Sequence, residues 1–159
     1  SGGSINHALL CGNIYNELRA ALKHKKANCK AINSELKLFI EKKNSYVYPD
    51  AMVVCDSLQK SNTIAEAITN PIVIVEVLSK TTTDYDRGDK FYLYRQIPSL
   101  QEYVLIDQYK PIVETYYKKP NIDLWQINRF MGLNDTIKLQ SIDIQISMSD
   151  LYFDIEEIN

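Results

Sequence analysis

The stretch that decides the fold is Pro71-Ile72-Val73-Ile74-Val75-Glu76-Val77-Leu78-Ser79. Seven of these nine residues are apolar and most are β-branched, which predicts a strand buried on both faces of a sheet. Alternation along the strand puts Glu76 on the same face as Ile74 and Leu78. The three interleaved valines, Val73, Val75 and Val77, then cover the opposite face.

Glu76 is the one acidic residue in this apolar run. Burying an unpaired carboxylate costs far more free energy than one strand residue can return. The run therefore predicts a bound cation, a buried ion-pair partner or a strand end that opens into a cleft. A water-facing position on an edge strand is the alternative, and the density of β-branched neighbours argues against it. Glu76 is our first candidate functional residue.

The composition indicates one ordinary globular domain. The chain has 159 residues, of which 45% are hydrophobic and 24% charged, enough to bury a substantial core. The net charge of −2 gives no overall attraction to a polyanion, so binding of nucleic acid would need a local basic patch or a metal ion. We find no apolar run long enough to cross a bilayer and no signal peptide.

The three cysteines, Cys11, Cys29 and Cys55, are odd in number, widely spaced and without ligand-like spacing. This pattern predicts neither a disulfide framework nor a zinc site. It is typical of reduced, buried thiols, and we expect a cytoplasmic protein.

Hydrophobic periodicity predicts a mixed α/β fold, with a central mixed β-sheet flanked by helices. Helices are expected over residues 4–26, from 83 or 84 to 96, and from 147 or 149 to 153, and a polar loop over 56–70. The predicted strands cover residues 35–41, 46–55, 71–79, 103–107, 112–117, 124–130, 136–139 and 142–146.

Asp50 follows Pro49 at a strand entrance or bulge, where a sheet can direct a side chain outward. Neighbouring strands lie about 4.8 Å apart, so Asp50 and Glu76 on consecutive strands could share Mg²⁺ or Mn²⁺. Such a site suits phosphodiester hydrolysis, provided that a cation also orients the attacking water. Lys80 and Lys90 could each supply that cation, and the residues alone leave both open.

Five parts of the chain resemble one known family. They are Tyr48-Pro49-Asp50 with Val53-Val54-Cys55; Asn70-Pro71 through Ser79; Tyr85-Asp86-Arg87-Gly88-Asp89-Lys90-Phe91 with Tyr94; Ile97-Pro98-Ser99-Leu100-Gln101-Glu102-Tyr103-Val104-Leu105-Ile106-Asp107; and Ser1-Gly2-Gly3-Ser4 with Asn6-His7. Together they resemble the Uma-type restriction endonuclease family, a branch of the PD-(D/E)XK nuclease superfamily. The likeness covers essentially the whole chain, so we expect a restriction-endonuclease-like core.

The resemblance implies a set of site residues. Asp50 and Glu76 would be the metal-binding carboxylates, and the backbone carbonyl of Val77 a further ligand. Leu78 stands where the superfamily carries its lysine. The resemblance implies that this lysine has moved to the following helix, as Lys90, with Lys80 as the second choice.

Further candidates surround this set. Tyr94 could support Lys90 or a phosphate, or fill the core. His7 is a supporting candidate, although a histidine in the first turn of a helix is more often structural than a ligand. Arg87 and Arg95 are candidate contacts to DNA phosphates, although solvated arginines are common. We expect one nuclease-like domain over residues 1–159 that lacks a native N-terminal segment.

The leading hypothesis is a Mg²⁺-dependent endonuclease that hydrolyses DNA phosphodiester bonds. The runner-up is a non-catalytic DNA- or protein-binding module that keeps the fold and has lost turnover. A third is a structural or dimerisation domain that uses Tyr116, Tyr117 and Trp125. A homodimer is compatible with two-strand cleavage, but no sequence feature requires one.

Overall fold

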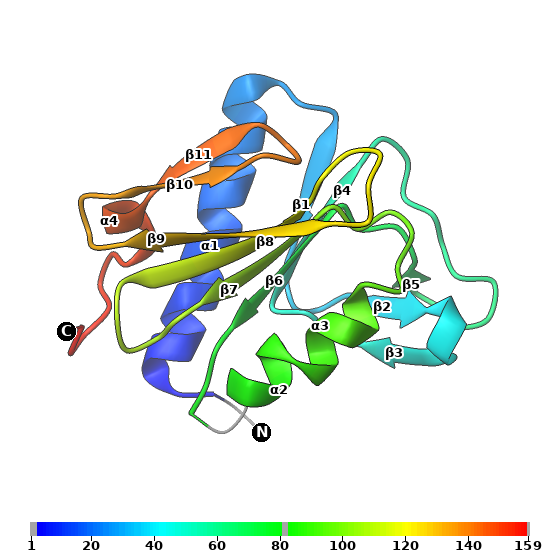
Figure 1. Cartoon of the computed structure of the whole chain (residues 1–159), viewed down its shortest axis with the longest axis horizontal. Helices are drawn as coiled ribbons and strands as arrows, with labels where there is room; N and C mark the ends of the chain where they lie inside the picture. The colour runs from blue at the N-terminus through cyan, green and yellow to red at the C-terminus, as the bar shows by residue number, and fades with distance from the viewer. Residues whose placement is uncertain (1–2, 81–82, 159) are drawn as a thin grey trace.

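The computed structural model describes residues 3–80 and 83–158, so Ser1 and Gly2 of the N-terminal resemblance lie outside the described residues. Its centre is a six-stranded sheet (Figure 1). In spatial order the strands are β1 (Cys29–Ile32), β4 (Ala51–Cys55), β6 (Val73–Val77), β7 (Glu102–Ile106), β8 (Ile112–Lys118) and β9 (Trp125–Met131). β6 and β7 are parallel and the other neighbours antiparallel, which confirms the predicted central mixed sheet.

One face of the sheet is covered by α1 (Ile5–Lys25), which passes behind the sheet in Figure 1. Its buried side chains follow a spacing of four residues and are Leu10, Ile14, Leu18 and Leu22. They pack against the valines of β6 that alternate with Glu76. The helix is capped by Ser4, whose hydroxyl accepts the His7 N–H at 3.0 Å.

The C-terminal part of the chain packs on this same face. The hairpin of β10 (Thr136–Leu139) and β11 (Ile144–Ser147) and the short α4 (Met148–Leu151) lie beside α1 (Figure 1). All three elements were predicted, with boundaries that differ by one or two residues.

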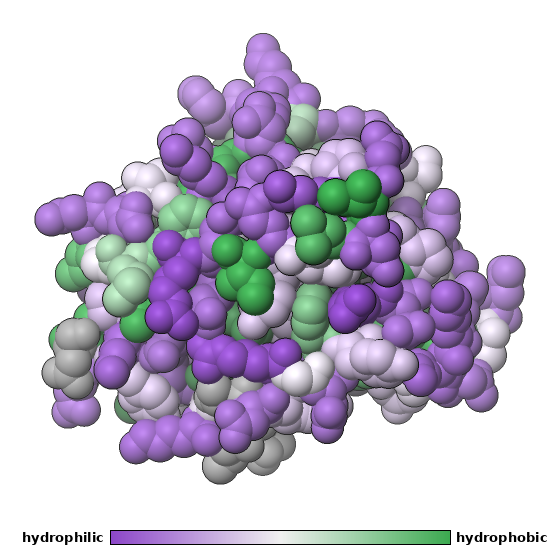
Figure 2. Space-filling model, viewed as in Figure 1, coloured by the Kyte–Doolittle hydropathy of each residue, from purple (hydrophilic) through white to green (hydrophobic). Residues whose placement is uncertain are grey.

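The other face carries Ile74 and Leu78, as the alternation predicts. It is covered by α2 (Thr83–Arg87) and α3 (Asp89–Tyr94) and by a small sheet of β3 (Ser45–Val47), β2 (Lys37–Ile40) and β5 (Ala67–Ile68). A 3₁₀ turn, η1 (Glu41–Lys43), joins β2 to β3. In the view shared with Figure 1, Figure 2 shows a mostly hydrophilic surface with small, separate hydrophobic patches.

Three element predictions need correction. The expected polar loop over 56–70 contains the short strand β5. The expected helix to Gln96 is two helices, because Gly88 takes a non-helical conformation (φ −103°, ψ −89°) between α2 and α3. The expected strand over 46–55 is also two strands, β3 and β4, which belong to different sheets. The intervening Pro49 has no N–H to donate to a ladder.

The prediction that all cysteines are reduced is wrong for two of them, because Cys29 and Cys55 form a disulfide. They face each other across the antiparallel β1–β4 pair. Periodicity did not reveal the four-residue β1, so their proximity was hidden. The cysteines therefore give no argument for a reducing compartment. Among the described residues, no helix is both long and apolar enough to cross a membrane.

Candidate active site

Asp50 and Glu76 meet where β4 begins and β6 ends. In the antiparallel β4–β6 pair Ala51 is opposite Val75, so the next position along the ladder brings Asp50 opposite Glu76. The two carboxyl groups are close enough for a hydrogen bond from Glu76 to Asp50. Local pairing between two short strands therefore creates an acidic pair at one end of the sheet.

Asp50 is held on two sides. The Val77 N–H donates to its Oδ2 at 2.7 Å, and His7 Nε2 lies 3.4 Å from the same oxygen. Burial alone would raise the pKa of Asp50, but the hydrogen bonds from His7 and Val77 outweigh burial and hold it below its usual value. Asp50 therefore stays ionised and has a fixed orientation.

Glu76 is the buried member of the pair, with 4% of its surface exposed. Its Oε1 accepts a hydrogen bond from the Tyr94 hydroxyl at 2.7 Å, and Lys90 Nζ lies 3.0 Å from the same atom. Burial raises the pKa of Glu76 to about 8; Lys90 offsets part of that rise and Asp50 adds to it. Glu76 therefore ionises less readily than an exposed glutamate.

Lys90 connects two buried acids. Besides Glu76, its ammonium lies 3.6 Å from Oδ1 of Asp86, one helical turn earlier. Burial lowers the pKa of Lys90, but the charges of Glu76 and Asp86 outweigh it, so the pKa is raised. The lysine therefore stays charged beside the acidic pair.

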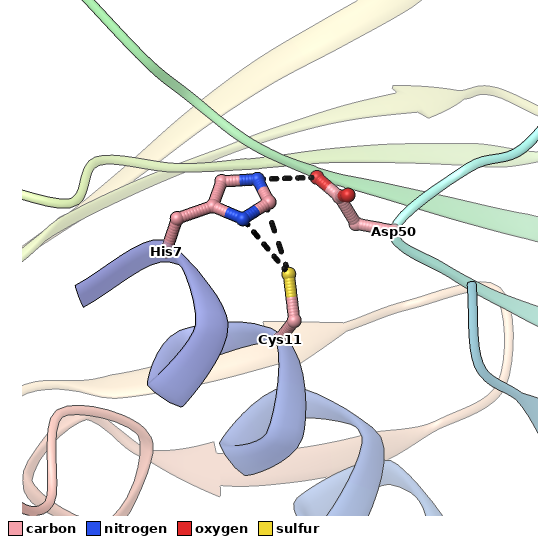
Figure 3. Close-up of side chains that lie close together, drawn as sticks. All are labelled: His7, Cys11 and Asp50. Atoms are coloured by element: carbon pink, nitrogen blue, oxygen red, sulfur yellow. Dashed lines mark hydrogen bonds and ion pairs between the residues drawn. The ribbon is translucent and has the colours of Figure 1, made fainter. Parts of the chain in front are cut away.

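His7 and Cys11 flank Asp50 from the side of α1 (Figure 3). One ring nitrogen of His7 faces Asp50, and Nδ1 lies 3.6 Å from Cys11 Sγ. Hydrogen bonding to Asp50 is the main reason why the pKa of His7 is raised despite partial burial. Burial, together with the charges of Asp50 and Glu76, raises the pKa of the Cys11 thiol to about 12.

The other predicted residues have partners outside the acidic pair. Lys80 stacks over the Tyr109 ring with its Nζ 5.2 Å from the ring centroid, and Arg95 stacks over Phe91 at 5.5 Å. Arg87 is paired with Glu114, to which its Nε donates at 3.0 Å. Of the two candidate lysines, the structure brings Lys90 to Glu76.

Sequence reasoning missed two neighbours of the site, Asp86 and Cys11. Each follows from helical spacing, since Asp86 lies four residues before Lys90 and Cys11 four residues after His7. The four-residue spacing was visible in the sequence, but it becomes informative only once Lys90 and His7 are assigned to the site.

The donor set suits a hard divalent cation. Mg²⁺ prefers carboxylate and carbonyl oxygens with several waters, and Asp50 and Glu76 offer carboxylate oxygens side by side. The charge of Asp50 raises the pKa of Glu76, and a dication bound between the two acids could offset that repulsion. The residues therefore fit Mg²⁺ or Mn²⁺.

Comparison with known proteins identifies relatives of this chain. Residues 1–149 match the Uma2 family, described as "Putative restriction endonuclease". Two proteins of Synechocystis are similar. The protein sll1609 is 35% identical over 144 residues, covering 91% of this chain and 80% of its own length. The protein slr1290 is 34% identical over 151 residues, covering 95% of this chain and 76% of its own length.

A solved structure shares the fold. It is described as "a putative nuclease belonging to DUF820" from Anabaena variabilis, and it superposes with a TM-score of 0.73. The match covers 96% of this chain and 83% of that one, at 16% sequence identity. The restriction-endonuclease-like arrangement of sheet and helices expected from the sequence is thereby confirmed as a fold.

Proposed function

This chain belongs to the Uma2 family, and from that premise we propose that it is a Mg²⁺-dependent endonuclease that hydrolyses DNA phosphodiester bonds. One observation carries the proposal. Asp50, Glu76 and Lys90 come from three separate elements, and Glu76 contacts both of the others. Two carboxylates and an ammonium group are the residue types that metal-assisted phosphodiester hydrolysis requires.

Asp50 and Glu76 would hold the cation, and the backbone carbonyl of Val77 is the proposed third ligand. The N–H of the same residue donates to Asp50. Bound Mg²⁺ would polarise the scissile phosphate and lower the pKa of a coordinated water. The side chains around the pair support this role, because the Tyr94 hydroxyl and the Val77 N–H fix the two carboxylates before any ligand arrives.

Lys90 would orient the attacking water and stabilise the charge that develops on the phosphate. Its pairing with Asp86 and Glu76 keeps the ammonium charged and directed toward the acidic pair. Arg87 and Arg95 are proposed as phosphate contacts. Arg87 lies on α2 and Arg95 directly follows α3, so both would meet DNA beside Lys90.

Calorimetry with Mg²⁺ and Mn²⁺, combined with nicking of supercoiled plasmid, tests the proposal. We expect Asp50→Asn and Glu76→Gln to lose both metal binding and nicking. Lys90→Met should still bind metal but nick about 10²- to 10³-fold more slowly, the usual cost of removing one charge-stabilising donor. Lys80→Met, on the lysine that stacks over Tyr109, should nick at the wild-type rate.

A folded wild-type protein that binds neither cation would contradict the proposal. If that protein also bound DNA in a salt-sensitive way, a non-catalytic binding module would be the better description. Loss of nicking in Lys80→Met but not in Lys90→Met would show that the role assigned to Lys90 is wrong.

A further inference from the structure

Three side chains on one side of the acidic pair form a compact group of different ligand types. His7, Cys11 and Asp50 each offer one ligand atom, and these atoms all lie within 4.8 Å of one another. His7 and Cys11 lie one turn apart on α1 and point from the same side toward the start of β4 (Figure 3). The proposed endonuclease mechanism makes no use of Cys11.

We propose that His7, Cys11 and Asp50 form a binding site for a borderline transition-metal ion of the Zn²⁺ type, which shares Asp50 with the Mg²⁺ site. A thiolate, an imidazole and a carboxylate are ligands that zinc accepts together. A thiolate is a poor ligand for Mg²⁺, which prefers oxygen. The ligand chemistry therefore separates this site from the pair formed by Asp50 and Glu76.

The two distances from His7 Nε2 are close to those of tetrahedral coordination, and all three ligand atoms lie within 4.8 Å of one another. With nitrogen and oxygen ligands at about 2.1 Å and sulfur at about 2.3 Å, the edges of the tetrahedron are about 3.4 Å (N to O) and about 3.6 Å (N to S). Nε2 lies 3.4 Å from Asp50 Oδ2 and 4.0 Å from Cys11 Sγ. Bringing Cys11 into place requires a shift of a few tenths of an ångström.

The groups are held in position by the fold and remain accessible. Ser4 caps the turn of α1 that carries His7, and the Val77 N–H fixes Asp50. The side chains of His7 and Asp50 keep 24% and 17% of their surface exposed, and Cys11 is only partly buried. An ion can therefore enter from solvent, and a water can complete the coordination, as in zinc sites with three protein ligands.

Sharing Asp50 couples the two sites. An ion held by His7 and Cys11 would withdraw Asp50 from the pair with Glu76, so Zn²⁺ should inhibit Mg²⁺-dependent cleavage. This consequence rests on the proposed function, whereas the binding of the ion itself does not. The two can therefore be tested separately.

Cobalt(II) absorption tests the binding site directly, because thiolate ligation adds an intense near-ultraviolet band and tetrahedral geometry intensifies the visible bands. The chain has three cysteines, of which Cys29 and Cys55 are disulfide-bonded, so a thiolate band reports Cys11. We expect one equivalent of Co²⁺ to produce both features and Zn²⁺ to bleach them. Cys11→Ser should abolish the thiolate band.

Zn²⁺ affinity, measured by competition with a chromophoric chelator, should fall in Cys11→Ser by more than the roughly 10- to 100-fold that follows loss of an outer-shell partner. The double variant Cys29→Ser/Cys55→Ser is the matched control and should keep the band. Glu76→Gln should also keep it while losing Mg²⁺ binding. These two controls separate a failure of the transition-metal site from a failure of the nuclease proposal.

Alkylation gives a readout that needs no variant at Cys11. Because the raised pKa of the Cys11 thiol slows alkylation, iodoacetamide is used in excess at alkaline pH until the metal-free wild-type protein is modified at Cys11. Under the same conditions, one equivalent of Zn²⁺ should protect it. A Co²⁺ spectrum with no thiolate band in the wild type, a band that survives Cys11→Ser, or equal alkylation with and without Zn²⁺ would each overturn the proposal.

Discussion

At the scale of single residues, Glu76 determines how its neighbours are arranged. Its Oε1 receives both the Tyr94 hydroxyl and the Lys90 ammonium, from one helix on one face of the sheet. A buried carboxylate is tolerated only when hydrogen bonds and a counter-charge replace its lost hydration. The site is therefore also a place where the core would be destabilised if any one member were removed.

Tyr94→Phe tests this dependence, because it deletes one hydroxyl and keeps the packing of a fully buried ring. We expect the free energy of unfolding to fall by about 1–3 kcal/mol, the cost of leaving a buried acceptor without its partner. Nicking should slow less than in Lys90→Met, since the ammonium remains. Urea denaturation and plasmid nicking measure both effects.

Tyr92→Phe is the matched control for this change, because Tyr92 lies on the same helix with 61% of its surface exposed. It should leave both quantities unchanged. An equal loss of stability in the two variants would contradict the role assigned to the Tyr94 hydroxyl.

Glu102 is a second buried carboxylate, outside the candidate site. It accepts hydrogen bonds from the N–H and hydroxyl of Ser141, which tie β7 to the turn between β10 and β11. Burial raises its pKa even though these hydrogen bonds oppose the rise. The pKa of Glu102 in the folded protein is thus above its unfolded value of about 4.3. The protein therefore keeps its full stability at pH values below about 4.3, and it loses part of that stability as the pH rises through the folded pKa of Glu102.

Glu102→Gln removes this ionisation and keeps an acceptor for Ser141. The free energy of unfolding of the variant minus that of the wild type should therefore be larger at pH 7 than at pH 4. Urea denaturation of both proteins at both pH values measures this difference. Glu35→Gln, at an exposed position, is the control. A stability difference that does not change with pH would show that Glu102 does not resist ionisation.

At the scale of secondary-structure elements, the first turn of α1 links the residues of both proposed metal sites to the sheet. The Ser4 hydroxyl caps the helix and also donates to Gln108, whose amide donates to the Leu78 carbonyl at 2.6 Å. Leu78 directly follows β6. The start of α1 and the end of β6 are therefore joined by one short chain of hydrogen bonds.

Ser4→Ala should cut this chain. We expect the free energy of unfolding to fall by about 1 kcal/mol, the typical cost of losing an N-cap side chain. The same change should weaken Co²⁺ binding by His7 and Cys11, because their turn of α1 loses its anchor. Ser4→Thr keeps a hydroxyl and should behave like the wild type. Normal Co²⁺ affinity in Ser4→Ala would contradict the anchoring role.

The elements that periodicity predicted well are long or strongly patterned. Both α1 and β6 were found, because a 21-residue amphipathic helix and a β-branched run each give an unambiguous pattern. β1 was missed because four residues with a mixed burial pattern carry no period. The break at Gly88 was missed because a single glycine is compatible with a continuous helix.

The residues of the candidate site likewise divide into those that the sequence pattern could reveal and those that it could not. Asp50 and Glu76 could be predicted as neighbours because consecutive strands usually lie close together. The choice between Lys80 and Lys90 needed three-dimensional information, since both follow β6 closely and only the packing of α3 brings one of them to Glu76. Cys11 was not found from sequence, because its spacing from His7 becomes informative only once His7 is known to lie beside Asp50.

At the scale of the whole molecule, the sheet separates two hydrophobic clusters, one under α1 and one under α2 and α3. Asp50 contacts α1, Glu76 contacts α3, and the two acids contact each other. The site therefore depends on both faces being packed at once. Global stability should accordingly limit metal binding even for substitutions far from the site.

The disulfide tests this dependence, because it encloses the chain from β1 to β4, including Asp50, while lying at the other end of β4. With a sequence separation of 26 between the cysteines, the loop-entropy model predicts that Cys29→Ser/Cys55→Ser lowers the free energy of unfolding by about 3.5 kcal/mol. For a domain whose total stability is about 5–15 kcal/mol, that loss is large. It should appear as a lower urea midpoint.

Metal binding in that double variant should stay normal below the new unfolding transition, because the β4–β6 ladder and the Val77 N–H still fix Asp50. It should fail at a lower temperature than in the wild type, in step with unfolding. Reducing agent should shift the wild type to the same midpoint and leave the variant unmoved. A wild type insensitive to reductant would contradict the disulfide. Metal binding lost well before unfolding would instead show that the bond positions Asp50 directly.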